Sequence, residues 1–389
     1  MDFLGLLILE NRLKPETKPI LEELIAANIR TVMITGDNIQ TATTVAKNCG
    51  MIPESSKVIL VEAQGPNSSS PASVTWKLLE YPQNGKNNKL QETPISFEDG
   101  FDGKTQTIAD NDYHFSMSGK TYENLEKHFT YLLPKLLMNG TVFARMSPGQ
   151  KAAIIDDFRK LDYYVGMCGD GANDCAALKM ANAGISLSVQ EASVAAPFNS
   201  HVTNIQCVPE LLKEGRAALV TSFCMFKYMS MFGLIEYINT LLLYWQRNIF
   251  GNNQFLVHDF AIMFVIFLTM SSTPAYHKLA PYRPPGQLIS PSMLLSVVYN
   301  ILFTIAMQTY AFLIIQEQSW YSRTDVYSAC HPGNTSLNIN LTHELISERT
   351  KKNYESFENS TLWLLTAVHF VILAFIFSKG KPFRKTTVY

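Results

Sequence analysis

The chain contains an acidic, glycine-containing loop of a type that can hold a metal ion beside a phosphoryl group. The segment G-D-G-A-N-D at 169–174 follows a predicted strand over 163–168 and precedes a predicted helix. Carboxylate oxygens are the ligands that Mg2+ prefers, and a helix N-terminus attracts anions. We therefore interpret Asp170 and Asp174 as metal ligands or supports of the loop, and Asn173 as a hydrogen-bond donor to the phosphoryl group. The alternative is a tight acidic turn with no chemical role.

A second candidate site lies at another predicted strand-to-helix junction. Thr35, Gly36 and Asp37 follow the β-branched run R-T-V-M-I-T and precede a predicted helix over 39–48. A threonine hydroxyl and successive backbone N–H groups at such a junction can bind phosphate oxygens. A helix N-cap with acidic support is the alternative interpretation.

Lys151 is the third candidate. It stands in the first turn of a predicted helix over 148–160, which precedes the strand that ends in the acidic loop. A lysine there could neutralise negative charge on a transferring phosphoryl group. A solvated helix lysine is the simpler interpretation.

Strands and helices alternate around these candidates. Such alternation indicates a parallel sheet covered on both faces. Residues 62–112 are rich in Ser, Asn, Pro, Gly and Gln, and we expect a surface insertion there that is partly disordered. The predicted strands are 5–9, 30–35, 141–145, 163–168 and 183–187, and the predicted helices are 15–27, 39–48, 148–160 and 173–180.

The composition limits the class of protein. The formal net charge of the 389 residues is −1, so we expect no nucleic-acid partner. The six cysteines include no C-x-x-C pair, which favours reduced cytosolic thiols over disulfides or a zinc site. The start of the chain has no basic region of the kind that precedes a signal peptide.

Long apolar segments dominate the chain after about residue 216 and predict membrane spans. Each is about long enough to cross a bilayer as a helix, so we expect membrane lipid around them. Lys and Arg gather on the side that places both termini in the cytosol, and the loop 316–360 is then lumenal or extracellular. That loop and its border carry glycosylation sequons at Asn334, Asn340 and Asn359, although Asn67 and Asn139 match the pattern on the other side. The predicted spans are 220–244, 255–274, 291–315 and 361–377.

The order of the three candidate sites is that of a haloacid-dehalogenase-type phosphotransfer site, and three stretches resemble P-type ATPases. These are I-T-G-D-N at 34–38, F-A-R-M-S-P-G-Q-K at 143–151 and V-G-M-C-G-D-G-A-N-D-C at 165–175. The last two resemble the type V branch in particular. F-C-M-F-K-Y-M at 223–229 and F-S-K-G-K-P-F-R at 377–384 resemble subgroup B, whose members move polyamines out of late endosomes and lysosomes.

The resemblance implies a fold class and a set of roles. We expect an α/β, haloacid-dehalogenase-like (Rossmann-like) partial phosphorylation domain over 1–215, then an α-helical transmembrane bundle over 216–389. Mg2+ and ATP are the implied cofactors, and the implied location is an endomembrane such as the late endosome, lysosome or endoplasmic reticulum. By this resemblance Thr35 and Gly36 would contact the phosphoryl group, Asp37 would support their loop, and Lys151 would balance the phosphate charge. Asp170 would ligate Mg2+, with Asn173 and Asp174 beside it. Lys14 lies near the position of a nucleotide-proximal arginine of the family, although the local sequence here, E-N-R-L-K, differs.

The sequence also departs from the family. No D-K-T-G-T motif, which carries the phosphorylated aspartate, occurs in the chain. The actuator loop, the ATP-binding domain, the first four membrane helices and the last two are missing as well. Because covalent phosphoryl transfer needs the nucleophile, we expect this polypeptide alone not to pump. The amino-terminal part of the same pump is then a partner.

Two acids in the membrane segments are candidate substrate residues. Glu236 and Asp259 fall at similar predicted depths in the first two spans, so their carboxylates could face one cavity. Paired acids suit a polycation such as spermine or spermidine. A helix-packing hydrogen bond for Glu236 and a lumenal rim position for Asp259 are the alternatives.

Two hypotheses for the whole chain therefore stand, and a third fails. It is a segment of an ATP-driven polyamine transporter, or a non-catalytic truncated membrane protein that binds or regulates full-length pumps. A pump for calcium or another metal cation is an alternative cargo class, although the spans lack a dense set of oxygen ligands. A free-standing phosphatase of the haloacid dehalogenase class is the third, and it fails because no D-x-D nucleophile motif precedes Thr35 in the chain.

Overall fold

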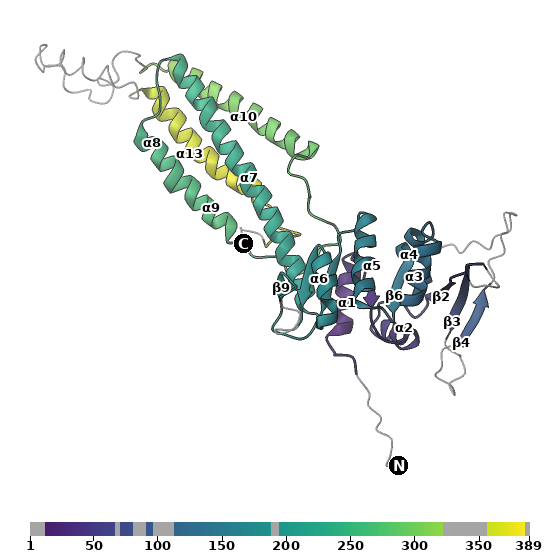
Figure 1. Cartoon of the computed structure of the whole chain (residues 1–389). Helices are drawn as coiled ribbons and strands as arrows, with labels where there is room; N and C mark the ends of the chain where they lie inside the picture. Colours follow the sequence, from purple (N-terminus) through teal and green to yellow (C-terminus); the bar gives the residue numbers. More distant parts are fainter. Residues whose placement is uncertain are drawn as a thin grey trace, which may run out of the picture. The chain divides into compact units, whose positions relative to one another are not determined.

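The chain folds into two compact units, Met1–Leu212 and Lys213–Tyr389. The computed structural model describes residues 12–66, 71–80, 91–95, 113–187, 194–321 and 356–385. Of residues 80 and 91–95, only the backbone is described. The predicted strand 5–9 and the sequons at Asn67, Asn334 and Asn340 lie outside these residues. Figure 1 labels helices and strands of both units.

The first unit contains a mixed sheet with the strand order β1-β6-β5-β2-β3-β4. The strands β1, β6, β5 and β2 run parallel to one another, and β3 and β4 extend the sheet beyond β2 as an antiparallel meander. A second sheet, β7-β8-β9, is parallel. The strands are β1 (Met33–Ile34), β2 (Lys57–Gln64), β3 (Ser73–Glu80), β4 (Gln91–Ile95), β5 (Tyr113–Ser118), β6 (Gly140–Ala144), β7 (Gly166–Gly169), β8 (Ala183–Ser186) and β9 (Phe198–Asn199).

Helices cover both faces of the larger sheet because the strand side chains alternate in direction. Phe143 faces a core formed with α3, α4 and α5, while its neighbours Val142 and Ala144 face a second core formed with α2. The helices of this unit are α1 (Thr17–Ala26), α2 (Ile39–Asn48), α3 (Gly119–His128), α4 (Leu133–Asn139), α5 (Pro148–Lys160), the 3-10 turn η1 (Ala172–Asp174) and α6 (Cys175–Met180).

The polar segment 62–112 does not form only irregular chain. Its first residues end β2, and β3 and β4 pair across the sheet edge through registers such as Val61 with Trp76. The prediction of a partly disordered surface insertion over 62–112 did not include these strands. Alternating residues such as Val74, Trp76 and Leu78 supply the apolar face that the overall polar composition conceals.

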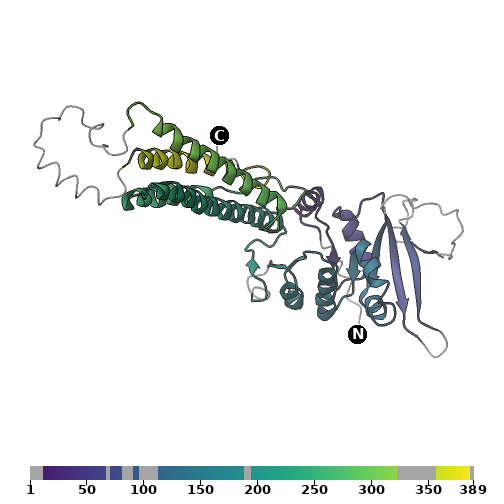
Figure 2. The ribbon, with the colours of Figure 1, turned by 90° about the horizontal axis from the view of Figure 1, so that it is seen from above.

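The second unit is a bundle of long apolar helices (Figure 2). Among the described residues, four helical segments are long and apolar enough to cross a membrane, and each coincides with a predicted span. They are α7 (Cys207–Trp245), the continuous segment Asn252–Ser271 made of α8 (Asn252–Leu256), η2 (Val257–Met263) and α9 (Phe264–Ser271), α10 (Pro291–Gln316) and α13 (Phe357–Phe377).

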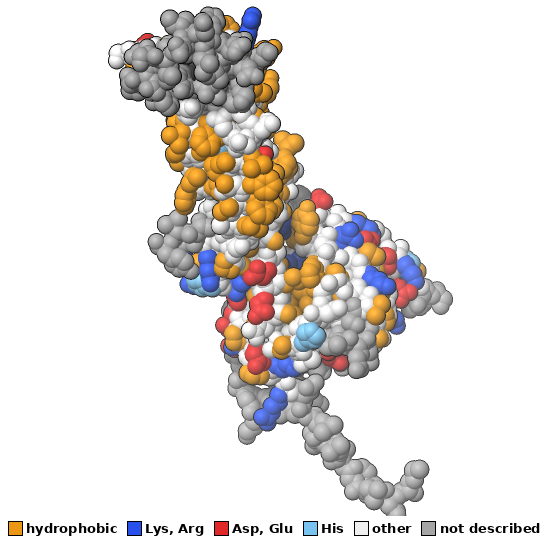
Figure 3. All heavy atoms as spheres, turned by 90° about the vertical axis from the view of Figure 1, so that its left-hand side faces the viewer, with side chains coloured by type: hydrophobic (Ala, Val, Ile, Leu, Met, Phe, Trp, Pro, Cys, Tyr) orange, Lys and Arg blue, Asp and Glu red, His pale blue; other side chains and the backbone are white. Residues whose placement is uncertain are grey.

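The bundle core follows one face of α7. Cys224, Tyr228, Met231 and Ile235 recur at helical spacing and pack with residues of α9 and α13. Many large apolar side chains remain exposed on the same helices, and Figure 3 shows them gathered over this unit. Outward apolar surface of this extent fits lipid as the surrounding solvent.

Asn359 is not an exposed glycosylation acceptor. It lies in the first turn of α13 with no accessible surface, and its amide donates to the carbonyl of Ile249 at 2.9 Å. The sequon at this position is therefore a chance match.

Candidate phosphoryl-binding site

The Thr35–Asp37 loop is held at the carboxyl end of the parallel strands. The Thr35 amide donates to the Phe143 carbonyl at 2.9 Å, and the Met146 amide donates back to the Thr35 carbonyl at 3.0 Å. The Thr35 hydroxyl accepts a 3.1 Å hydrogen bond from the Asp37 amide, and Gly36 and Asp37 are exposed. The loop thus presents a hydroxyl and backbone amides at the sheet edge where open α/β folds bind ligands.

Lys151 is fixed by the start of α5. Ser147 and Gln150 form a capping box, in which each side chain bonds the other residue's backbone. The Gln150 side chain also donates to the Gly119 carbonyl at 2.9 Å, which ties α5 to α3. These bonds set the direction of the first turn, from which Lys151 projects.

Lys151 and Asp174 form an ion pair. The Lys151 Nζ donates to the Asp174 Oδ1 at 2.7 Å, and the two side chains are each 12% exposed. A Cβ added at Gly169 would lie 2.7 Å from the Asp174 Oδ2, so only glycine leaves room for this carboxylate. Asp174 therefore acts here as the partner of the lysine, in line with the supporting role that the sequence allowed for it.

Asp170 is the carboxylate that remains exposed in the acidic loop, and Asn173 is exposed beside it. Burial, followed by the charges of Cys207, Asp170 and Asp174, raises the pKa of the Cys168 thiol to about 12. The Asp170 and Asp174 carboxylates contribute to this shift after burial. An exposed carboxylate beside a second carboxylate could hold Mg2+, with Asp170 as the candidate ligand.

The structure joins the predicted site residues through one shared loop. The segment after β6 bonds the Thr35–Asp37 loop through the Arg145 amide, which donates to the Asp37 carbonyl at 3.0 Å. The same segment leads into α5 and Lys151, and Lys151 reaches the acidic loop through Asp174. Lys14 lies apart from this chain of contacts, because its ammonium bonds the Thr203 carbonyl and hydroxyl.

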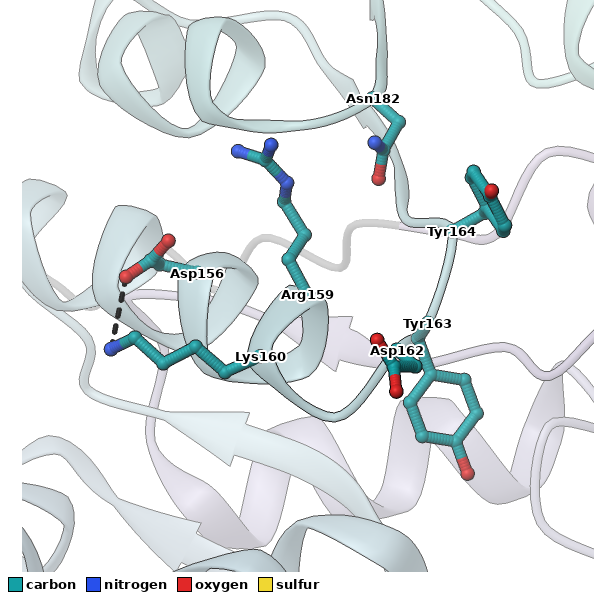
Figure 4. Close-up of a pocket in the computed structure, with 7 residues that line it drawn as sticks. All are labelled: Asp156, Arg159, Lys160, Asp162, Tyr163, Tyr164 and Asn182. Carbon is teal, nitrogen blue, oxygen red and sulfur yellow. Dashed lines mark ion pairs between the residues drawn. The ribbon is translucent and has the colours of Figure 1, made fainter.

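A hollow of about 460 Å³ lies at the opposite end of α5 (Figure 4). It is near the last turn of the helix, whereas Lys151 is in the first turn. An ion pair of 3.0 Å joins Lys160 to Asp156 at its wall. The hollow is therefore separate from the phosphoryl site, and its lining residues are Asp156, Arg159, Lys160, Asp162, Tyr163, Tyr164 and Asn182.

Glu236 and Asp259, which the sequence predicts to face one cavity, have different surroundings in the structure. The Glu236 Oε1 lies 2.6 Å from the Nδ1 of His258, which has no accessible surface. Asp259, the next residue, is exposed on the π-helical turn η2. Since successive residues of a helical turn point in different directions, Asp259 does not share the contact of His258 with Glu236. Sequence reasoning missed His258 because a lone histidine carries no spacing signal.

Sequence reasoning also missed a polar layer inside the bundle. Asn239 of α7 and Gln308 of α10 both bond the Thr366 hydroxyl of α13, and all three are fully buried. Single amides within apolar segments were the available signal.

An α/β unit with a candidate phosphoryl-binding site, together with four membrane-length helices, fits a P-type transport ATPase, and comparison with known proteins agrees. The chain is 56% identical over 396 residues to the probable cation-transporting ATPase 13A4 of Gallus gallus, and 56% identical over 390 residues to the probable cation-transporting ATPase 13A5 of Homo sapiens. It is 43% identical over 393 residues to the polyamine-transporting ATPase 13A3 of Homo sapiens. No family model matches the chain.

Each of these alignments covers 99% of this chain and 32% of the relative. The chain thus spans about a third of the length of the curated relatives that it matches, and over that third it is a homologue of the 13A P-type ATPases. The resemblance to P-type ATPases is thereby confirmed.

Proposed function

We propose that this chain is the carboxy-terminal part of an ATP-driven, subgroup B polyamine pump. It supplies phosphoryl- and Mg2+-binding loops of a haloacid-dehalogenase-like domain and part of the cargo path. The observation that carries the proposal is the Lys151–Asp174 ion pair, which lies between two strand-end loops in a chain homologous to transport ATPases.

Within the phosphoryl site each residue has a physical task. Thr35 and the Gly36 amide donate hydrogen bonds to phosphoryl oxygens, and Asp37 braces their loop. Lys151 balances the developing negative charge, and Asp174 holds its ammonium in position. Asp170, with Asn173 beside it, would hold Mg2+, which neutralises phosphate charge when bound. Lys14 would lie near ATP, although its bond to Thr203 must then open.

The nucleophile is the missing part of this site. The 389 residues contain no D-K-T-G-T motif. Loss of the nucleophile from residues that act as a unit removes orders of magnitude of rate. We therefore expect the amino-terminal part of the same pump to supply the aspartate.

The cargo proposal rests on charge and on one relative's name. The 13A3 relative is named as polyamine-transporting, and Glu236 and Asp259 are carboxylates in the apolar unit. A polyamine needs such groups along its path. Relatives of higher identity are named as probable cation-transporting ATPases, which favours a metal or calcium cargo as the second candidate. Among the described residues, however, no three His, Cys, Asp or Glu side chains gather as metal ligands would.

The proposed location follows from the lysine and arginine distribution and from the subgroup. Both termini face the cytosol, and the helices lie in an endomembrane such as that of the late endosome, lysosome or endoplasmic reticulum.

The first test measures acid-stable phosphoenzyme from radiolabelled ATP and Mg2+. The chain is assayed alone and after co-expression with the amino-terminal portion of a 13A relative. We expect no label on the chain alone and label on the added portion. Label on this chain alone would show that another residue accepts phosphate and would refute the proposal about the aspartate.

The second test measures cargo. Glu236→Ala and Asp259→Ala are introduced separately into the co-expressed pump, and ATP hydrolysis is followed with spermine. Weaker stimulation is expected in both. If both variants respond as the parent does, these acids do not contact the cargo.

A further inference from the structure

Two fully buried amides meet at one hydroxyl in the centre of the bundle. The Asn239 Nδ2 donates to the Thr366 Oγ1 at 2.7 Å, and the Gln308 Nε2 donates to the same oxygen at 3.0 Å. The Thr366 hydroxyl donates its own hydrogen to the Leu362 carbonyl at 2.6 Å. Since this hydroxyl has no further hydrogen to donate, the two amides must present nitrogen to it.

This arrangement leaves two amide oxygens without partners. Neither the Asn239 Oδ1 nor the Gln308 Oε1 has a hydrogen-bond partner among the residues that the structure describes. Both side chains have no accessible surface. An unpaired buried acceptor is costly, and more so in a membrane, where water cannot enter freely. Two such acceptors around one hydroxyl indicate that a donor belongs there.

A third acceptor lies one helical turn away. The Glu236 Oε1 is bonded to His258, but the Glu236 Oε2 is buried and has no partner among the described residues. Glu236 and Asn239 are three residues apart on α7 and so lie on the same face. The facing helix agrees, because Trp363 of α13 stacks on His258 at 5.6 Å, and Thr366 is the next contact along that face.

The number and charge of these acceptors select a ligand. A primary ammonium group carries one positive charge and three N–H donors. The unpaired oxygens at Glu236, Asn239 and Gln308 equal those donors in number, and Glu236 is the acidic residue among the three. A water molecule offers two donors and no charge, and Mg2+ or Ca2+ takes six or more oxygens.

We propose that Asn239 and Gln308, together with the Glu236 Oε2, form a binding site for a primary ammonium group, the terminal amine of a polyamine. The inference rests on the proposed polyamine cargo and extends its path from Glu236 toward α10 and α13. Recognition depends on N–H donors as well as on charge. A cation with methyl groups in place of these hydrogens is therefore rejected, because it leaves the amide oxygens unpaired.

The test uses the 389-residue chain in lipid nanodiscs and measures spermine binding by calorimetry. Asn239→Leu and Gln308→Met keep side-chain volume and remove an acceptor, and we expect each to weaken spermine binding about tenfold or more. Gln316→Met is the matched control on α10, because the Gln316 amide reaches Glu358 instead, at 3.5 Å. It is expected to bind spermine as the parent does. Spermine that is N-methylated until every nitrogen is quaternary keeps its charges but has no N–H donor. It is expected not to compete with spermine for binding.

The variants also separate binding from folding. Each variant also removes the N–H donor to the Thr366 hydroxyl, so its melting temperature is measured beside its spermine binding. A variant that melts as the parent does and binds spermine more weakly has lost a contact to the ligand. If Gln308→Met does not fold, Asn239→Leu alone decides the matter. Unchanged spermine binding in a folded Asn239→Leu chain overturns the site.

The outcomes distinguish this inference from the cargo proposal. If spermine binds the parent and Glu236→Gln weakens it, but Asn239→Leu and Gln308→Met do not, the ammonium site is wrong and the cargo role of Glu236 stands. Equal binding of N-methylated spermine also refutes the site. If the parent binds no spermine, the proposed cargo fails, and the site fails with it.

Discussion

The ammonium of Lys151 lies 2.7 Å from a carboxylate oxygen of Asp174, across 23 residues of sequence. This contact joins the first turn of α5 to the acidic loop after β7. It holds the lysine at the edge where the predicted phosphoryl-binding loops gather.

Breaking this pair should destabilise the first unit. Lys151→Met leaves the Asp174 carboxylate largely buried without a partner, and removal of one member of such a pair costs about 3 kcal/mol. Lys151→Met with Asp174→Leu should restore part of that loss, since no lone charge remains. Thermal melting of the single and double variants measures the coupling. Additive losses would mean that the two groups do not interact.

Two glycines should respond differently to alanine. Gly169→Ala forces the Asp174 carboxylate aside, because the new Cβ would lie 2.7 Å from its Oδ2. The melting temperature should then fall by several degrees. Gly36→Ala adds a Cβ into open space, so stability should not change. If the Gly36 amide binds phosphoryl oxygens, phosphoenzyme in the co-expressed pump should nonetheless fall. An unchanged phosphoenzyme level would remove Gly36 from the site.

The alkylation rate of Cys168 should report on Asp170. Iodoacetamide reacts with the thiolate form of cysteine, and a pKa raised to about 12 keeps the Cys168 thiol protonated at pH 8. Alkylation of Cys168 should therefore be slow. Asp170→Asn removes one source of negative charge, lowers the thiol pKa and should speed iodoacetamide labelling severalfold at fixed pH. The labelling rate should rise with pH until the pH passes the pKa. Mass spectrometry of the Cys168 peptide follows the rate.

The same assay tests Mg2+ binding. The cation should speed labelling in the parent and not in Asp170→Asn, because its charge offsets that of the carboxylate. An equal effect in both chains would place the cation elsewhere.

His258 should matter to the bundle through its bond to Glu236. His258→Phe keeps an aromatic ring against Trp363 and removes the donor at 2.6 Å from the Glu236 Oε1. The loss should be about 1–3 kcal/mol, the cost of an unpaired buried acceptor. His369→Phe is the matched control, since the His369 Nδ1 has no partner among the described residues. Equal destabilisation by both variants would show that packing, rather than the hydrogen bond, is responsible.

The sequence by itself determined the local features of this protein. The acidic loop at 169–174, the Thr35–Asp37 loop and the capped start of α5 are each encoded by neighbouring residues, because turn and cap chemistry acts over a few positions. The four membrane helices were likewise predictable, since span length and apolar composition suffice to find them.

Only the tertiary structure decided which of these residues meet. The partners of Lys151 and Glu236 depend on how separate helices and strands rotate against one another, which hydrophobic periodicity leaves open by a residue or two. The sequence predicted that Asp259 would face the same cavity as Glu236, whereas in the structure the preceding residue, His258, contacts Glu236 and Asp259 is exposed. Likewise, β3 and β4 are stabilised by pairing with neighbouring strands at the sheet edge. Because strand formation depends on such neighbours, the polar composition of this segment did not predict the two strands.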